Sequence, residues 1–151
     1  MEKDFVFGHS DPKPIRVLHV DDEPAALEIT KVLLRRAWKG DFEIIGALSA
    51  EEALEKLEKE HFDAIVADYK MPRMDGIEFL EEVRKSRKYA KTPFLLFTGK
   101  GGGEVAKEAF LRGADKYIEK VGDPTNQCIE LAHAIRELVE EKWWKKSWSE
   151  Q

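Results

Sequence analysis

The residues of this chain that are best suited to chemistry each follow a short apolar run. These groups are three acids after the first run, and an acid, a hydroxyl and an ammonium after later runs: Asp21, Asp22, Glu23, Asp68, Thr98 and Lys120. Short apolar runs rich in β-branched residues are typical of buried strands. Ligands of an open parallel sheet bind beyond the carboxyl ends of its strands. We therefore expect these side chains to meet at one edge of a sheet.

Carboxylates gathered at one edge need a cation between them. Two like charges about 4 Å apart repel by roughly 4 kcal/mol at an effective dielectric constant near 20. Mg²⁺ suits a site that offers one or two carboxylates together with waters and phosphoryl oxygens. Any one of these acids alone would more often be a helix cap or a solvated turn residue. Their combination with Thr98 and Lys120 favours a magnesium site.

The elements that must position these groups alternate between strand and helix. The expected strands are Ile15–Val20, Phe42–Leu48, Asp63–Ala67, Phe94–Phe97 and Asp115–Glu119. The expected helices are Ala26–Trp38, a segment capped by Ser49 and Glu52 that runs to about His61, Ile77–Arg87, Glu104–Arg112 and a last helix that starts at Asp123-Pro124. This alternation predicts an α/β fold, with right-handed crossovers and helices on both faces of a parallel sheet.

Composition narrows the class of protein. A chain of 151 residues is about one domain, and 42% hydrophobic with 36% charged residues is typical of a soluble globular protein. The net charge of -5 argues against direct nucleic-acid binding. A single cysteine, Cys128, fits a reducing compartment. Since neither a membrane span nor a signal peptide is visible in the sequence, we expect a cytoplasmic protein.

Four segments together resemble those of response-regulator receiver domains of two-component signalling. They are the double acid Asp21-Asp22, the segment Asp68–Gly76 (D-Y-K-M-P-R-M-D-G), the strand end Phe97–Gly99 and the segment Tyr117–Lys120. They follow the order of the family between about Ile15 and Glu140. The resemblance implies a flavodoxin-like (βα)5 fold, a doubly wound five-stranded parallel sheet with strand order 2-1-3-4-5.

The resemblance also implies a function for the acids. Asp68 would accept a phosphoryl group from a phosphohistidine of a sensor histidine kinase or a histidine phosphotransfer protein. Mg²⁺ would be bound by Asp22, by Asp68 and by the backbone carbonyl of Lys70, with Asp21 acting mostly through a bound water. Such a phospho-acceptor catalyses only its own phosphorylation and dephosphorylation, so it is not counted as an enzyme.

The remaining roles concern the phosphoryl oxygens. Lys120 would neutralise one of them and Thr98 would donate a hydrogen bond to another, since phosphoryl transfer rewards positioned donors and cations. Tyr117 resembles the aromatic switch that turns inward behind this threonine and alters a protein-interaction surface. Lys70 and Lys100, each two residues beyond a site residue, either overhang the phosphoryl group or point to solvent, as lysines usually do.

Two other functions remain open at this point. A phosphatase of the haloacid-dehalogenase type needs Asp-x-Asp after its first strand, whereas Asp21 is followed here by Asp22 and Glu23. A receiver-like interaction module that is never phosphorylated usually lacks an acid, the threonine or the lysine, and this chain keeps them all. A second copy of the chain is a further candidate partner.

Three segments are expected: an N-terminal arm over residues 1–14, the receiver domain over 15–141, and a Trp/Lys-rich tail over 142–151. The tail holds Trp143, Trp144 and Trp148, and it is expected to extend the last helix or to pack back on the domain.

The sequence departs from the family at one position. Receivers usually follow the lysine with proline in a cis bond, but Lys120 is followed here by Val121. A cis bond before a residue other than proline costs about 2.5–4 kcal/mol, so the Lys120–Val121 bond is expected to be trans. Gly122 is expected to compensate by taking a backbone conformation that other residues avoid.

Overall fold

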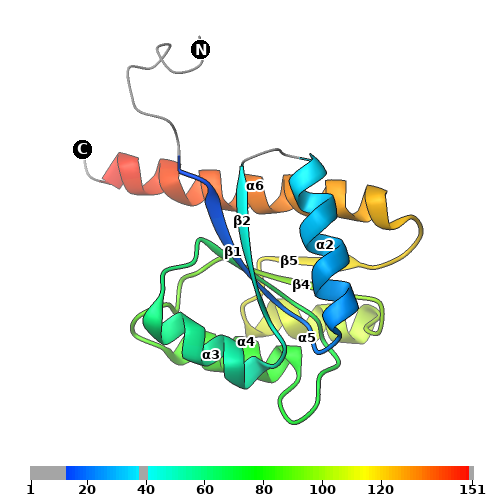
Figure 1. Cartoon of the computed structure of the whole chain (residues 1–151). Coiled ribbons are helices and arrows are strands. Elements are labelled where there is room, and N and C mark those ends of the chain that lie inside the picture. The colour runs from blue at the N-terminus through cyan, green and yellow to red at the C-terminus, as the bar shows by residue number, and fades with distance from the viewer. Residues whose placement is uncertain (1–12, 38–40, 150–151) are drawn as a thin grey trace.

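One five-stranded parallel sheet forms the centre of the protein, as the computed structural model of residues 13–37 and 41–149 shows (Figure 1). Its strands are β1 (Ile15–Val20), β2 (Phe42–Ala47), β3 (Ala64–Ala67), β4 (Phe94–Thr98) and β5 (Lys116–Glu119). Every neighbouring pair is parallel, and the order is β2-β1-β3-β4-β5. The flavodoxin-like strand order that the resemblance implied is therefore confirmed.

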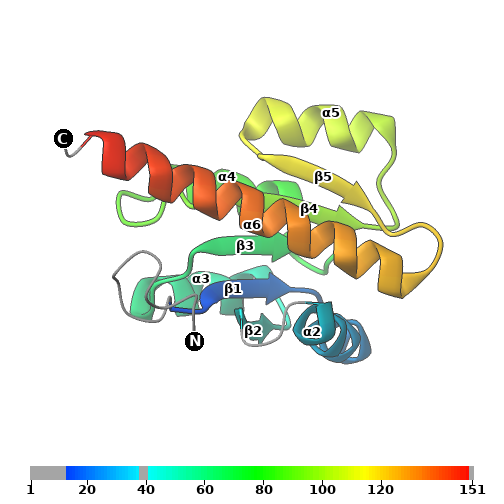
Figure 2. The same ribbon diagram turned by 90° about the horizontal axis from the view of Figure 1, so that it is seen from above.

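Five helices cover the two faces of this sheet (Figures 1 and 2). They are α2 (Pro24–Ala37), α3 (Ala50–Lys59), α4 (Gly76–Lys85), α5 (Gly103–Arg112) and α6 (Pro124–Ser149). Residues of α3, α4 and α5 join one buried apolar cluster with one side of the sheet, and residues of α2 and α6 join a second cluster on the other side. The chain is thus a three-layer α/β fold.

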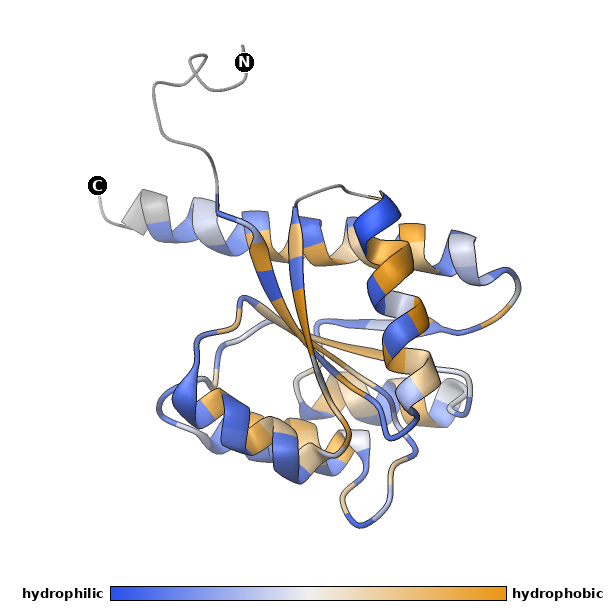
Figure 3. Ribbon diagram, in the orientation of Figure 1, coloured by the Kyte–Doolittle hydropathy of each residue, from blue (hydrophilic) through white to orange (hydrophobic). Residues whose placement is uncertain are grey.

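Successive side chains of a strand point to opposite faces of the sheet, so the core is divided between the two faces. Leu18 and Val20 of β1 pack with α3 and α4, whereas Val17 packs with Leu131 and Ile135 of α6. Figure 3 shows the same division, because apolar colours lie along the sheet and the inner helix faces while polar colours lie outside. Full burial of each such side chain contributes about 1.5–3 kcal/mol.

Helix boundaries differ from the expected ones where side chains cap the backbone. Ser49 accepts a hydrogen bond from the backbone N–H of Glu52 at 3.0 Å, but the Glu52 carboxylate accepts from Leu48 rather than from Ser49. α4 ends at Lys85 because the Ser86 hydroxyl accepts from two following backbone N–H groups and starts a turn. The expected end of α2 at Trp38 lies outside the described residues.

The last helix, α6, runs without interruption past residue 141 to Ser149. Its second half runs towards the end of the sheet where the strands begin (Figure 2). Residues 1–12 of the expected arm lie outside the described part of the chain. Within the described residues, no helix combines the length and the apolar character that a bilayer crossing needs.

Candidate functional site

Strand register brings the expected site residues to one edge of the sheet. Val20 of β1 pairs with Ala67 of β3, so the residues that follow them are neighbours. The backbone N–H of Asp68 donates to the carbonyl of Val20 at 2.9 Å, which continues the ladder past the end of β3. In the same way, the N–H of Lys120 donates to the carbonyl of Thr98 at 3.0 Å. The carboxyl ends of β1, β3, β4 and β5 therefore meet at this edge.

The ammonium of Lys120 lies between two carboxylates at this edge. Its Nζ is 3.1 Å from Oδ2 of Asp21 and 3.8 Å from Oδ2 of Asp68. It also lies 5.1 Å from the centre of the Phe97 ring, within the range of a cation–π contact. Because Asp21 is 0% exposed, this ammonium compensates a carboxylate that would otherwise be buried as an isolated charge.

Asp21 is fully engaged by its surroundings. Its Oδ1 accepts a hydrogen bond from the backbone N–H of Glu23 at 3.0 Å, and its Oδ2 accepts from Lys120. Asp21 is also absent from the residues that line the pocket beside Asp68. In the structure the Asp21 carboxylate therefore contacts Lys120 and the backbone of Glu23.

Asp68 opens into a pocket of about 280 Å³, called here the Asp68 pocket. One carboxylate oxygen of Asp68 accepts from the backbone N–H of Tyr69 at 2.7 Å. The pocket is lined by Asp22, Glu23, Asp68, Lys70, Met71, Pro72 and Lys100. Both Lys70 and Lys100 therefore border the pocket.

The donor set of the Asp68 pocket fits Mg²⁺. Its walls include three acids, Asp22, Glu23 and Asp68, which offer hard oxygen atoms. In the described part of the chain, no three His, Cys, Asp or Glu side chains are close enough to form a complete protein cage for a metal. A site of few carboxylates that leaves room for waters is the kind that Mg²⁺ prefers.

Thr98 and Tyr117 are linked through the glycine-rich loop after β4. The buried hydroxyl of Thr98 accepts from the backbone N–H of Lys100 at 3.1 Å. The hydroxyl of Tyr117 accepts from the N–H of Gly102 at 2.9 Å. A Cβ atom at Gly101 would come within 2.1 Å of that hydroxyl and 3.3 Å of Cγ2 of Thr98. Glycine at position 101 thus makes room for Tyr117 to lie against the loop.

The turn after Lys120 has the predicted backbone. The Lys120–Val121 bond is trans, as are all peptide bonds of the described residues, and Gly122 has a φ of 85°. The carbonyl of Gly122 accepts from Nε2 of Gln127 in the first turns of α6 at 3.1 Å. Both expectations about this departure are confirmed, and the chain reaches α6 while Lys120 still lies beside Asp68.

His19 lies in β1 behind the site and is 1% exposed, as expected for a packed histidine. Burial is the main cause that lowers the pKa of His19 to about 3; the positive charge of Lys120 acts in the same direction, and the negative charge of Asp68 opposes the shift. Among the described residues, Nδ1 of His19 has no hydrogen-bond partner. The imidazole is therefore neutral at physiological pH.

Three residues of the site were not assigned a role by sequence reasoning. Glu23 lines the Asp68 pocket, and its place in the acidic run after β1 was the available signal. The Phe97 ring below Lys120 and the Gly102 N–H that binds Tyr117 left no signal in the sequence, because both contacts depend on how β4 and β5 pair.

Comparisons with known proteins agree with this arrangement. A profile of the response regulator receiver domain matches residues 17–132. The chain is 38% identical over 112 residues to the transcriptional regulatory protein TrcR of Mycobacterium tuberculosis, covering 74% of this chain and 41% of that protein. It is 30% identical over 127 residues to the response regulator Rre1 of Synechocystis, covering 84% and 52%. The chain thus spans about half the length of these curated relatives.

Solved structures give the same result. A CheY-like response regulator receiver domain protein from Methanospirillum hungatei superposes with a TM-score of 0.74 at 32% identity, covering 87% of this chain and 98% of that one. The chemotaxis response regulator CheY4 of Vibrio cholerae superposes with a TM-score of 0.70 at 30% identity, covering 81% and 98%. The chain belongs to the response regulator receiver domain family of two-component signalling.

Proposed function

We propose that this receiver domain accepts a phosphoryl group on Asp68 from the phosphohistidine of a sensor histidine kinase or a histidine phosphotransfer protein. The observation that carries the proposal is the position of the Lys120 ammonium, which lies 3.1 Å from Asp21 and 3.8 Å from Asp68, a residue that lines the Asp68 pocket. A cation held in this way stabilises the negative charge of a transferring phosphoryl group.

The residues of the chain divide the transfer among them. A carboxylate oxygen of Asp68 forms the new P–O bond while the P–N bond of the donor histidine breaks. Lys120 neutralises one phosphoryl oxygen, and the Thr98 hydroxyl donates to another. Since Asp21 already holds Lys120 through a buried contact, the ammonium needs little reorganisation when the phosphoryl group arrives.

Asp22, Asp68 and the backbone carbonyl of Lys70 would bind Mg²⁺, with Asp21 contributing mostly through a water. When bound, the ion offsets charge on the carboxylates and on the phosphoryl oxygens. The supporting observation is that Asp22, Asp68 and Lys70 border one pocket, whereas both oxygens of Asp21 already accept hydrogen bonds.

The signal would leave the site through Tyr117. Its hydroxyl is bound to the loop that follows Thr98, so a pull of the phosphoryl group on Thr98 alters the surface around β5. In this proposal the protein is a cytoplasmic signalling phospho-acceptor that catalyses only its own phosphorylation and dephosphorylation, binds no nucleic acid itself and switches a surface for a protein partner, including a second copy.

Intact mass after incubation with acetyl phosphate and Mg²⁺ tests the proposal. The full chain should gain one phosphoryl group, and Asp68→Asn should gain none. Asp63→Asn is the matched control, because Asp63 precedes the same strand at the opposite edge of the sheet, and this variant should be labelled normally. Undiminished labelling of Asp68→Asn would refute the assignment. A wild-type chain that is never labelled would favour the interaction module that works without phosphorylation.

The metal assignment has its own measurement. Loss of Asp22 removes a direct ligand, so Asp22→Ala should require a much higher Mg²⁺ concentration for half-maximal labelling. Equal Mg²⁺ dependence in Asp22→Ala and wild type would place the ion elsewhere.

A further inference from the structure

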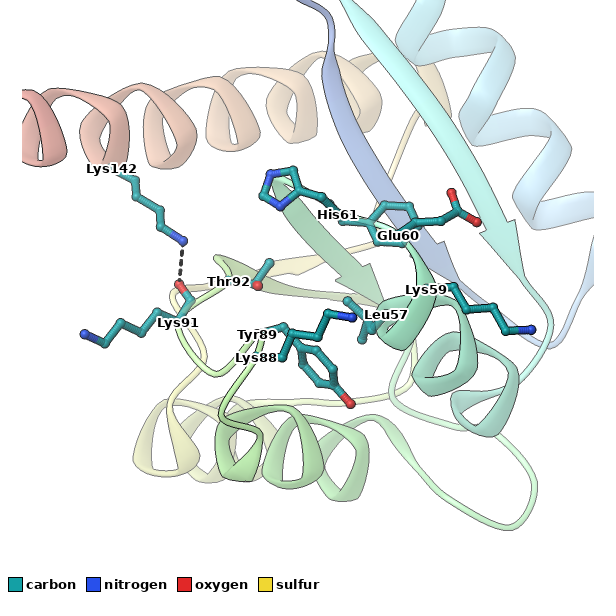
Figure 4. A pocket seen from close by; sticks show the side chains of 10 residues that line it. Leu57, Lys59, Glu60, His61, Lys88, Tyr89, Lys91, Thr92 and Lys142 are labelled. Carbon is teal, nitrogen blue, oxygen red and sulfur yellow. Dashed lines mark hydrogen bonds between the residues drawn. The ribbon is translucent and has the colours of Figure 1, made fainter.

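A second hollow of about 250 Å³ lies at the edge of the sheet opposite to Asp68, and we call it the basal pocket (Figure 4). It is bounded by the end of α3, the loop between α4 and β4, and the second half of α6. Its lining residues are Leu57, Lys59, Glu60, His61, Phe62, Lys88, Tyr89, Lys91, Thr92 and Lys142. None of them belongs to the phosphorylation site.

The basal pocket is basic in a chain whose net charge is -5. Its lining includes four lysines but one carboxylate, and that carboxylate, Glu60, accepts from Arg16 at 2.8 Å. Among residues 13–37 and 41–149, none of the four lysines has a carboxylate within 4.0 Å. Positive charge is therefore concentrated here without a direct carboxylate partner among the described residues.

Two of the ammonium groups are held by backbone carbonyls instead. Lys88 donates to the carbonyl of Glu58, and Lys142 donates to the carbonyl of Lys91 at 3.2 Å. Figure 4 shows Lys88 and Lys142 reaching inward from the α4–β4 loop and from α6, while the side chains of Lys59 and Lys91 point outward. Carbonyl acceptors orient these ammonium groups but leave their charges uncompensated.

Partial desolvation adds to this effect at Lys142, although the residue is exposed as a whole. Desolvation is the main cause that lowers the pKa of Lys142. The positive charges of Arg84 and Lys91 act in the same direction, and the negative charges of Asp63 and Asp115 oppose the shift. An ammonium that loses hydration and gains no carboxylate is in an unfavourable position. A bound anion would offset this cost.

The pocket also offers neutral groups. Thr92 is buried, and Figure 4 shows its side chain between Lys142 and Leu57. Leu57 and Phe62 add an apolar wall. Two ammonium groups and a hydroxyl can together neutralise and hydrogen-bond the several oxygens of a phosphoryl group, which lysine binds as a point charge.

We propose that the basal pocket binds a small phosphate-bearing anion through Lys88, Lys142 and the hydroxyl of Thr92. A hollow of about 250 Å³ accommodates a small anion. Since Lys142 belongs to α6 and Lys88 to the α4–β4 loop, such a ligand ties the second half of the long helix to the body of the domain. This function is separate from phosphorylation of Asp68.

Titration of the full-length, ¹⁵N-labelled chain with inorganic pyrophosphate in the absence of Mg²⁺ tests this site. Saturable shifts are expected at the backbone amides of Tyr89, Thr92 and Lys142. Lys88→Gln and Lys142→Gln should each weaken binding roughly tenfold, because each removes a hydrogen bond to a charged group. Lys142→Arg should retain most of the affinity. Lys107→Gln is the matched control, since Lys107 is an exposed lysine on α5, outside the pocket lining.

Three outcomes would overturn the proposal: linear shifts without saturation, equal loss of affinity in Lys107→Gln and Lys142→Gln, or shifts confined to the Asp68 pocket. Tighter binding of a poly-glutamate peptide than of pyrophosphate would also overturn it, because the surface would then be one for acidic protein segments. Asp68→Asn should bind pyrophosphate with unchanged affinity, so the test of the basal pocket does not depend on the phosphorylation site.

Discussion

The Lys120 ammonium contacts two carboxylates, and the two contacts differ in length. The shorter contact is with the buried Asp21, and the longer one is with Asp68, which opens into the Asp68 pocket. Negative charge added at Asp68 would draw the ammonium towards it, since the Coulomb energy grows with the charge and falls with distance. Before any phosphoryl group arrives, the Lys120 ammonium is therefore held by Asp21 and can still move towards Asp68.

Removal of Lys120 should destabilise the domain through Asp21. In Lys120→Met the buried Asp21 carboxylate loses its cation, and we expect the free energy of unfolding without Mg²⁺ to fall by roughly 1–3 kcal/mol. The double variant Asp21→Asn/Lys120→Met should recover part of this loss, because a neutral amide no longer needs the ammonium. Urea unfolding of the two single variants and the double variant measures the coupling. Additive losses would show that the two side chains do not interact energetically.

His19 should make stability depend on pH. Its folded-state pKa of about 3 lies below the ordinary value of 6.5, so the neutral form is the one that the fold accommodates. The contribution is complete above about pH 6.5 and is lost as the pH falls towards 3, at about 1.4 kcal/mol per pH unit. Between about pH 6.5 and pH 5, wild type should lose about 2 kcal/mol more than His19→Leu. Parallel curves of stability against pH for the two proteins would contradict this.

The turn between β5 and α6 contains the position at which the sequence departs from that of the family. Positive φ at Gly122, together with the bond from Gln127 to its carbonyl, brings the chain from Lys120 to the start of α6 over a trans bond. The position of the Lys120 ammonium therefore depends on a local backbone conformation that glycine adopts without cost.

Gly122→Ala should weaken both the fold and the site. A residue with a Cβ atom pays about 1–2 kcal/mol in the left-handed region, so the free energy of unfolding should fall by about that amount. Labelling by acetyl phosphate should slow as well, because relaxation of the turn displaces Lys120. Gly103→Ala is the control: a Cβ atom there meets no neighbour, and alanine within a helix is expected to stabilise α5 slightly. Equal behaviour of the two variants would show that the turn tolerates other conformations.

Across the whole molecule, patterns that repeat along the chain were predictable and contacts between distant segments were not. The apolar runs and their following acids located Asp68 at the end of β3, and the family resemblance supplied the strand order. The preference of Lys120 for Asp21 and the bond between Tyr117 and Gly102 depend on side-chain positions across paired strands, which no local pattern encodes.

Some predicted helix boundaries and caps were wrong for a related reason. The end of α4 was placed two residues too late, because the apolar period says nothing of the Ser86 hydroxyl that captures two backbone N–H groups. The Glu52 carboxylate was expected to complete a capping box with Ser49 but binds the N–H of Leu48. Caps are chosen by geometry within a fraction of an ångström, and sequence signals locate them to within a few residues.

The second half of α6 should contribute to stability as part of the domain. Truncation after Glu141 removes the bond from Lys142 to the carbonyl of Lys91, and we expect the free energy of unfolding to fall by about 0.5–1.5 kcal/mol. Truncation after Lys146 keeps this contact and should have a smaller effect. Asp68 labelling should proceed in both. If the two truncated chains are as stable as the full chain, the segment is an appendage without a structural role.

Because α6 is one uninterrupted helix, it also forms a stiff link between the end of the sheet that holds Lys120 and the opposite end, where the basal pocket lies. Its 26 residues span about 39 Å at 1.5 Å per residue, from the turn that follows Lys120 to the edge where Lys142 lies. A rod under axial load neither shortens nor bends appreciably. Any movement of α6 along its own axis is therefore transmitted in full from one end of the helix to the other. The two ends of the sheet can be coupled in this way without a rearrangement of the sheet itself.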